Sequence, residues 1–415
     1  MPQQALHSLP QTNSLPSARS RPLDAMRIVL VALVVAHHSA MAYLPEAPPV
    51  ARSLRAVPHW WQAFPIVDPA KWSGFSLFVA FNDTFFMAAL FLLSGFFVWS
   101  SLRRKGVNAF LRDRSLRLGK AFLFAAFAIS PLAYYATYKQ IGIAHPSAGF
   151  WKQWFELGSW PAGPAWFLWL LLTFDLLAAG LFRFVPERTE ALATAIKNYR
   201  PAILFVLLTL FSTTCFAPMA LHFGSMSWST FGPFSVQTSR IFHYLAYFIA
   251  GLLLGAAGLE SSVLHSGSAL ARRWWAWLAA SLVSFLLMVG LALAAMREPP
   301  SVLWGAIVSF TFCLSCATAT FAVLAVFLRF VNGKGRVWEA LGGASFGVYI
   351  VHYAFVSWIQ YWLVPSAIPA IAKAAVVTSG ALLLSLGLVH GWKRLMSNSR
   401  NSVGTGSLQD EMTTH

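Results

Sequence analysis

The chain has 415 residues, of which 57% are hydrophobic and 11% charged, whereas about 25% of residues in an average soluble domain are charged. A soluble fold could not bury so much apolar surface, so an ordinary globular domain is excluded. The net charge of +16 does not indicate nucleic-acid binding, because no basic face stands clear of the apolar segments, and we expect no nucleic-acid partner.

Apolar segments long enough to cross a bilayer recur along the whole chain. They predict an all-α, polytopic integral membrane bundle of about ten transmembrane helices, with no large soluble domain. Most of the 30 Lys and Arg residues fall on one side of these spans, so the positive-inside rule predicts that both termini are cytoplasmic. The predicted spans cover roughly residues 27–45, 76–100, 118–138, 164–183, 201–220, 240–258, 274–295, 302–329, 344–364 and 367–391.

Both ends of the chain are polar. Residues 1–20 are rich in Ser, Pro and Gln and are expected to form a disordered cytoplasmic tail. Residues 393–415 are expected to form a second cytoplasmic tail, disordered from residue 397 onward. The membrane domain is therefore expected to cover residues 21–392.

The first predicted span carries two ionisable residues on one helix face. Arg27 and His38 are eleven residues apart, which places them roughly 16 Å apart along the helix axis and nearly in line. The guanidinium is then at the cytoplasmic rim and the imidazole near the bilayer midplane, where ionisable groups are costly and by default mark a functional site. His38 is therefore a candidate general base near pH 7. A core histidine that hydrogen-bonds to a neighbouring span fits the same position.

The neighbours of these two residues refine the interpretation. Asp24 precedes Arg27 by three residues and is close enough to pair with it on the first turn. Arg27 is then either a topology anchor or the contact for an anionic group that arrives from the cytoplasm. His37 points about 100° away from His38, and because no third ligand is evident, we expect no metal site.

The most basic stretch is the segment 101–120, which we expect between the second and third spans on the cytoplasmic side. Arg112, Arg114 and Arg117 cluster there, and the last two share a helix face. These residues either retain the segment inside or bind the phosphates of a cytoplasmic cofactor, for which forked guanidinium donors are well suited.

Later spans carry further polar residues. Asp175, within the fourth span, needs a partner and is expected to pair with an arginine of the site. Arg240 begins a polar stripe near the outer end of the sixth span. Ser345, Tyr349 and His352 follow an i, i+4, i+7 pattern, so they form one stripe that should face the bundle. Either stripe could also serve only to hold helices together.

Other segments predict structure. Residues 46–75 and 139–163 are external connections rich in Trp, and the second suits an interfacial lid or belt. Gly251 and Gly255 form a small-residue pattern that predicts close helix packing.

These segments together resemble the acyltransferase 3 group of integral-membrane acyltransferases, and in particular its glucan-modifying O-acyltransferase branch. The resemblance extends from about residue 21 to residue 390. In chain order, the family's motifs correspond to Asp24, Arg27 and His38 in the first span, Ser94 and Gly95 in the second, the basic pair Arg114 and Arg117, Trp166 in a WFL block, and the late stripe of Ser345, Tyr349 and His352.

The resemblance implies a membrane-bound O-acyltransferase. It implies that an acetyl or succinyl type of acyl group moves from cytoplasmic acyl-CoA, a co-substrate and not a permanently bound cofactor, to a hydroxyl of an extracytoplasmic carbohydrate or glycan. The expected location is a bacterial-type inner membrane, with membrane lipids as further partners.

The resemblance also suggests roles for the candidate residues. His38 would be the general base, with transfer either direct or through a transient acyl-imidazole. Tyr349 and His352 would line the cavity or stabilise the oxyanion. The groups that hold the donor phosphates or polarise the thioester carbonyl would be guanidinium groups, namely Arg27, Arg112, Arg114 and Arg117.

Two other classes of protein fit the same residues. A proton-coupled transporter or flippase of a sugar-containing or small polar substrate would also need buried His and Arg. The sequence, however, has no internal repeat of the kind found in transporters built from inverted halves. A membrane sensor or scaffold would leave the polar stripes as helix contacts alone.

Overall fold

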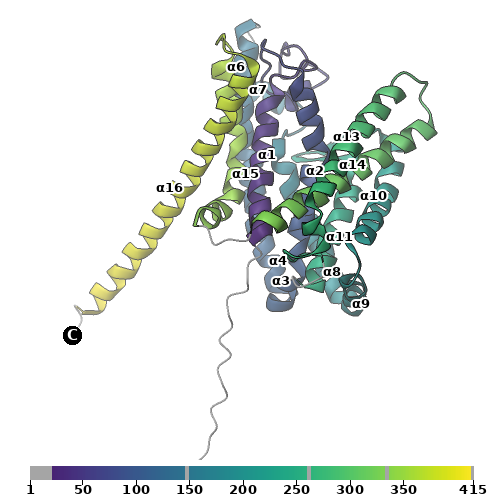
Figure 1. The fold of residues 1–415 in the computed structure, drawn as a ribbon. Helices are drawn as coiled ribbons and strands as arrows, with labels where there is room; N and C mark the ends of the chain where they lie inside the picture. Colours follow the sequence, from purple (N-terminus) through teal and green to yellow (C-terminus); the bar gives the residue numbers. More distant parts are fainter. Residues whose placement is uncertain (1–20, 145–148, 259–262, 332–335, 413–415) are drawn as a thin grey trace, which may run out of the picture.

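A computed structural model describes residues 21–144, 149–258, 263–331 and 336–412. Long helices run side by side through most of the molecule (Figure 1), as expected where a bilayer forces the backbone to satisfy its hydrogen bonds within each segment. The predicted tail 1–20 lies outside the described residues.

Nine of the described helical segments are long and apolar enough to cross a membrane. Eight of them contain α1 (Arg21–Met41), α2 (Gly74–Phe96), α8 (Trp166–Phe184), α10 (Pro201–Phe223), α11 (Ile241–Ala257), α13 (Trp274–Ala295), α14 (Val302–Phe330) and α16 (Ala370–Met412). The ninth predicted span, 344–364, lies in α15 (Arg336–Leu363), which is long enough to cross a bilayer but is not among these nine segments. The predicted all-α, polytopic fold is confirmed.

The remaining span is a rod of five consecutive helical pieces. They are α4 (Val107–Arg114), η2 (Ser115–Gly119), α5 (Lys120–Phe124), η3 (Ala125–Ile129) and α6 (Ser130–Ala144). The two η segments of the rod are π-helical turns, a feature often found at functional sites. The rod begins at Val107, well before the predicted start of the third span at residue 118, so Arg112, Arg114 and Arg117 all lie within it.

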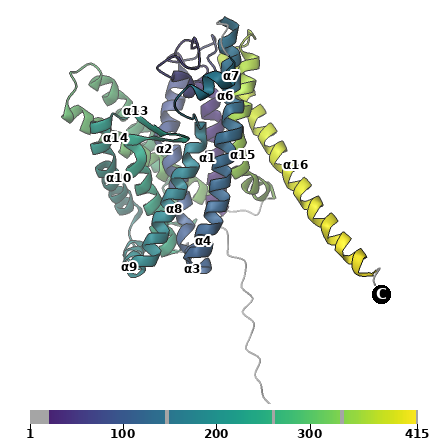
Figure 2. The same ribbon diagram turned by 180° about the vertical axis from the view of Figure 1, so that it is seen from behind.

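The bundle has two ends (Figures 1 and 2). The basic end holds the start of α1 together with α3 (Val98–Lys105) and α9 (Pro186–Lys197). The opposite, loop end holds the connection between α1 and α2, residues 42–73, and the short helix α7 (Phe150–Phe155). The other short helical elements are η1 (Trp60–Gln62), η4 (Gly163–Ala165), η5 (Thr238–Arg240) and α12 (Ala269–Arg272).

One β-hairpin was not predicted. Strands β1 (Trp228–Phe231) and β2 (Phe234–Gln237) pair antiparallel around a two-residue turn. Gly232 in the turn has a φ of 54°, which such tight hairpin turns require. The hairpin is too short to alter the fold class.

The C-terminal helix differs from expectation. α16 continues to Met412, so the polar segment expected to be disordered from residue 397 is helical as far as that residue. Its sequence contains no proline to end the helix. From Gly391 to Ser397 every side chain is exposed, and the helix leaves the bundle toward the basic end (Figure 1).

Glycines bring α2 and α11 into backbone contact, as the sequence predicts. A Cβ atom at Gly251 would overlap the carbonyl oxygen of Leu92, and one at Gly255 would overlap that of Phe96. From the other side, a Cβ at Gly95 would overlap a carbonyl oxygen of α11. No larger residue fits these positions unless the two helices move apart.

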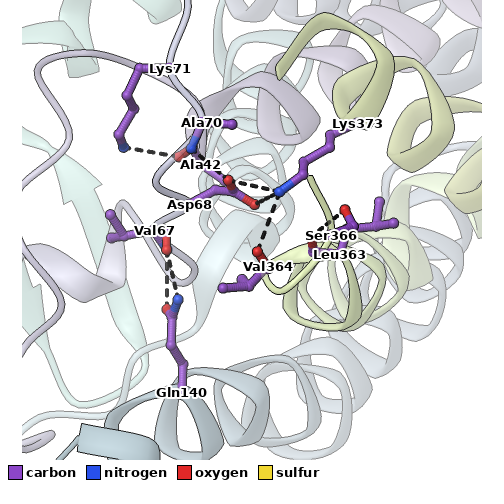
Figure 3. Close-up of polar contacts among 10 residues, drawn as sticks. All are labelled: Ala42, Val67, Asp68, Ala70, Lys71, Gln140, Leu363, Val364, Ser366 and Lys373. Carbon is purple, nitrogen blue, oxygen red and sulfur yellow. Dashed lines mark hydrogen bonds and ion pairs between the residues drawn. The ribbon is translucent and has the colours of Figure 1, made fainter. Parts of the chain in front are cut away.

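A buried ion pair fastens the loop end to α16 (Figure 3). The Nζ atom of Lys373 lies 2.8 and 3.0 Å from the carboxylate oxygens of Asp68, and these side chains are 1% and 0% exposed. The residue before Asp68, Val67, is held as well. The side-chain amide of Gln140 pairs with both its backbone N–H and its backbone carbonyl. The connection between α1 and α2 is therefore held to both α6 and α16.

We expect Gly251→Ala to lower the free energy of unfolding by roughly 1–3 kcal/mol, because the methyl group has to displace backbone atoms of α2. The matched control is Gly290→Ala in α13, where nothing lies within 4 Å of the added Cβ. Alanine there should be neutral or slightly stabilising. Thermal unfolding in detergent micelles measures both, and equal effects would contradict the close contact.

We expect Lys373→Met to lower the free energy of unfolding by roughly 3–5 kcal/mol, because it leaves the buried Asp68 carboxylate without its ion-pair partner. The double variant Asp68→Asn/Lys373→Met should regain most of that loss, since no buried charge remains. The same unfolding assay compares the two variants. A double variant as unstable as Lys373→Met would refute this account of the pair.

Candidate active site

Helices α1 and α15 bring three histidines together. The ring centroid of His38 lies 5.4 Å from that of His37 and 5.5 Å from that of His352. The ring of Tyr353 lies at 5.1 Å and edge-on to His38. The pairing of the two helices therefore joins the first predicted motif to the last, which lies more than 300 residues away in sequence.

Hydrogen bonds from α15 fix the position of α1. The side-chain Nε2 of Gln360 donates to the carbonyl oxygens of His38 and Ser39, at 3.0 and 3.1 Å. These carbonyls belong to the last turn of α1, where helix carbonyls lack partners within their own helix. The amide thus satisfies two such groups and sets the register in which His38 meets His352.

The histidine cluster contains nitrogen atoms without partners. His352 Nδ1 lies 2.7 Å from the carbonyl oxygen of Tyr349; because a carbonyl only accepts, Nδ1 donates and Nε2 is left with a lone pair. Among the described residues neither His352 Nε2 nor His37 Nδ1 has a hydrogen-bond partner, although both are buried. Buried polar atoms in this condition are rare and point to a water or ligand in the functional state.

His38 itself is accessible. His37 and His352 are buried, but the His38 side chain is part-exposed, and within the described part of the chain its ring makes no hydrogen bond. An imidazole that is reachable and uncommitted can accept a proton from a hydroxyl group that enters the site. Nowhere in the described segments do three or more His, Cys, Asp or Glu side chains form a group able to hold a metal ion.

Tyrosines surround the cluster on the side of the loop end. The hydroxyls of Tyr353 and Tyr134 lie 3.4 Å apart, and both donate to the backbone carbonyl of Gln62. The hydroxyl of Tyr349 donates to the carbonyl of Pro164 at 2.5 Å. Tyr349 is therefore committed to holding α15 against the start of α8. Ser345, in the same stripe, donates back to its own helix at Gly342.

Arg27 occupies the same helix as His38, near the basic end. Its Nη1 lies 3.2 Å from Asp24 Oδ1, which confirms the predicted pair. The guanidinium also packs over the ring of Phe97, 5.1 Å from its centroid. Both charged side chains are about one-third exposed, so the pair lies at the rim of the bundle.

The three arginines of the basic cluster have different surroundings. Arg114 Nε lies 3.4 Å from a carboxylate oxygen of Asp175, a side chain that is fully buried, so the structure identifies the partner of that acid. Arg117 lies over the ring of Phe346, next to the stripe of α15. Arg112 is exposed on the surface of α4. The cluster therefore combines one structural arginine with two at the surface.

Arg240 belongs to a second polar centre. It is buried, and its Nη2 lies 2.6 Å from a carboxylate oxygen of Asp83 in α2, while Nη1 donates to the backbone carbonyl of the same residue. The guanidinium packs over the ring of Phe312. Trp166 stacks nearby on Tyr244, with centroids 5.7 Å apart. Trp166 and Arg240 thus lie among α2, α8, α11 and α14, and the Asp83–Arg240 pair is close enough to His37 to interact with it electrostatically.

Several residues of the site were not predicted. Asp83 lies within the second span, and a carboxylate inside an apolar helix would have signalled a buried partner. Gln360 and Tyr353 lie on α15, eleven and four residues after Tyr349, so they extend the stripe singled out from sequence but were not included in it. Polar residues along a membrane helix were the only available signal for them.

A comparison with protein families matches most of the chain. A family model described as an acyltransferase domain covers residues 22–390. That range contains all the candidate site residues and every span except the first residue of the first and the end of the last. No curated protein and no solved structure gives a significant match to the chain.

We expect Arg114→Ala to lower the free energy of unfolding by roughly 3–5 kcal/mol, because the buried Asp175 carboxylate loses its ion-pair partner. Asp175→Asn in the same background should restore most of the stability. Arg117→Ala is the matched control and should cost less, about 1 kcal/mol, since Arg117 is exposed, packs over the ring of Phe346 and is a second, weaker charge near Asp175 that makes no ion-pair contact with it. Thermal unfolding measures both variants. Similar losses of stability in Arg114→Ala and Arg117→Ala would refute the structural role assigned to Arg114 alone.

Proposed function

Because the chain belongs to the acyltransferase 3 family and is thus a membrane acyltransferase, we propose that it transfers an acyl group from acyl-CoA to a hydroxyl of an extracytoplasmic carbohydrate or glycan. The acyl group is of the acetyl or succinyl type. The donor approaches from the basic end, which is cytoplasmic under the positive-inside rule, and the acceptor approaches from the loop end. The membrane is the inner membrane of a bacterial-type cell.

The observation that carries this proposal is the partly exposed His38, whose ring lies inside the histidine cluster. His38 takes the proton of the acceptor hydroxyl as that oxygen attacks the thioester carbonyl. Collapse of the tetrahedral intermediate breaks the C–S bond, and the imidazolium returns the proton to the departing coenzyme A thiolate. The imidazole is neutral again at the end of the cycle.

The neighbours of His38 support this role. The carbonyl oxygen of the thioester becomes negatively charged in the tetrahedral intermediate. Hydrogen-bond donors placed beside that oxygen stabilise the charge. Tyr353 lies edge-on against His38, and its hydroxyl donates to the Gln62 carbonyl and to Tyr134, so it becomes an oxyanion donor only when the entering substrate takes the place of that carbonyl. The rings of His37 and His352 both lie close to that of His38. Neither carries a negative charge that would stabilise a protonated His38.

Donor binding is assigned to the basic end. Arg27 and Arg117 lie at its rim and keep part of their guanidinium surface exposed, and Arg112 is exposed as well. Guanidinium groups suit the phosphates of coenzyme A. Arg114 contributes indirectly, because its ion pair with Asp175 anchors the rod that carries Arg112 and Arg117.

We expect His38→Ala to lower the rate of acyl transfer by roughly 10²–10⁴-fold, the usual contribution of a general base. The measurement is release of free coenzyme A from labelled acyl-CoA by the purified protein in the presence of a glycan acceptor. His222→Ala, an exposed histidine at the end of α10, is the matched control and should retain full activity.

Membrane insertion and thermal unfolding of both variants are compared in parallel. Coenzyme A release that persists in a correctly folded His38→Ala variant would overturn the assignment of the base. Uptake of a sugar-containing substrate without any thioester cleavage by the unmodified protein would instead favour a transporter.

A further inference from the structure

A pocket of about 220 Å³ lies at the loop end, between residues 48–67 and the outer part of α6. It lies outside the histidine cluster, and neither the donor nor the proton transfer described above uses it. The lining residues that matter for its chemistry are Arg52, Trp60, Trp61, Phe64, Thr137 and Gln140.

The pocket combines aromatic walls with an uncommitted hydroxyl. Trp60 is 57% exposed, so its indole face is open, whereas Trp61 is buried and its Nε1 donates to the carbonyl of Leu54. Thr137, in α6, is 3% exposed, and its Oγ1 has no hydrogen-bond partner among the described residues. A buried hydroxyl without a partner costs free energy unless a bound group satisfies it. Arg52 adds an exposed cation to the lining.

The walls of the pocket are held rigidly. Gln140, which lines it, pairs with both backbone groups of Val67 on the opposite wall. The next residue, Asp68, is fixed by the buried ion pair with Lys373 (Figure 3). A pocket whose walls are fixed in this way needs little rearrangement to bind a ligand.

A continuous series of ring contacts joins the pocket to the reacting end of the site. The ring of Trp61 lies 5.1 Å from that of Tyr134, which lies 5.7 Å from that of Tyr353, the residue beside His38. The backbone carbonyl of Gln62, in the same short helix as Trp61, accepts from both tyrosines. The pocket therefore lies beyond the histidine cluster, on the side from which an acceptor would enter.

We propose that this pocket binds a sugar unit of the acceptor glycan, adjacent in the chain to the part whose hydroxyl reaches His38. This inference rests on the proposed function, because it assumes a carbohydrate acceptor. The volume lies below the roughly 300–1,000 Å³ of sites for drug-sized ligands, which fits one unit of an oligomer and not a whole oligosaccharide.

The lining matches the chemistry of a sugar ring. One face of a pyranose presents C–H groups that pack on the electron-rich face of an indole. Its edge presents hydroxyls, which can pair with the Thr137 hydroxyl and with the guanidinium of Arg52. A lipid chain would also contact the aromatic walls, but it would leave the Thr137 hydroxyl unsatisfied.

The test uses the full chain in lipid nanodiscs, which avoids detergents with sugar headgroups. A soluble gluco-oligosaccharide is titrated into the unmodified protein, Trp60→Ala and Thr137→Val, and affinity is measured by calorimetry. Each substitution should weaken binding roughly three- to tenfold. Trp151→Ala, an exposed tryptophan of α7 that does not line the pocket, is the matched control and should bind as the unmodified protein does.

Weaker binding in both pocket variants, with no change in Trp151→Ala, supports the inference. No binding to the unmodified protein, equal affinity in all variants, or binding of a short-chain fatty acid in place of the oligosaccharide would overturn it. A second readout is the KM for a glycan acceptor in the coenzyme A release assay, which should rise in Trp60→Ala while kcat and the KM for acyl-CoA stay unchanged.

The two proposals fail in different ways. If the oligosaccharide binds as expected but no thioester cleavage depends on His38, the proposed function fails and the saccharide site remains. If cleavage depends on His38 but Trp60→Ala leaves the affinity for oligosaccharide and the acceptor KM unchanged, only the inference about the pocket fails.

Discussion

Two hydrogen bonds from the Gln360 amide to the end of α1 determine how the candidate site is assembled. The last carbonyls of any helix lack partners, and a low-dielectric interior makes that lack costly. An amide supplied by α15 satisfies two of them at once. Because this contact fixes the axial position of α15, it also fixes the height at which His352 and Tyr353 face His38. The chemistry of the site therefore depends on a backbone requirement of α1.

Ion pairs between distant segments hold the rest of the bundle together. Three buried or half-buried acids each meet a cation from a distant segment, and these pairs are Asp68–Lys373, Asp83–Arg240 and Asp175–Arg114. Removing one member leaves a charge that the interior cannot solvate, which makes each pair a strong constraint on which helices can be neighbours. Backbone contact at the glycines of α2 and α11 adds a steric constraint between two central spans.

Periodicity and composition predicted the parts of this structure that depend on local sequence. The helical spans, the Asp24–Arg27 pair and the glycine contact depend on residue spacing within one helix, and the structure confirms them. The need of Asp175 for an arginine was predictable, but its choice of Arg114 was not, because that choice depends on how α4 packs against α8. The role of Asp83, the place of Tyr353 and the pocket under residues 48–67 depend on contacts between distant segments. No local pattern encodes such contacts.

His38 lies only three residues before the end of α1, close to the loop end, whereas Arg27 lies near the opposite end of the same helix. A rise of about 1.5 Å per residue separates the two levels by roughly 16 Å. On the proposed assignment the acceptor hardly has to enter the membrane. The thioester carbonyl of the donor, which comes from the basic end, has to cross most of the membrane to reach His38. Only a carrier that presents its cargo at the tip of a slender, extended arm can keep its phosphates in water and still deliver that carbonyl to the imidazole.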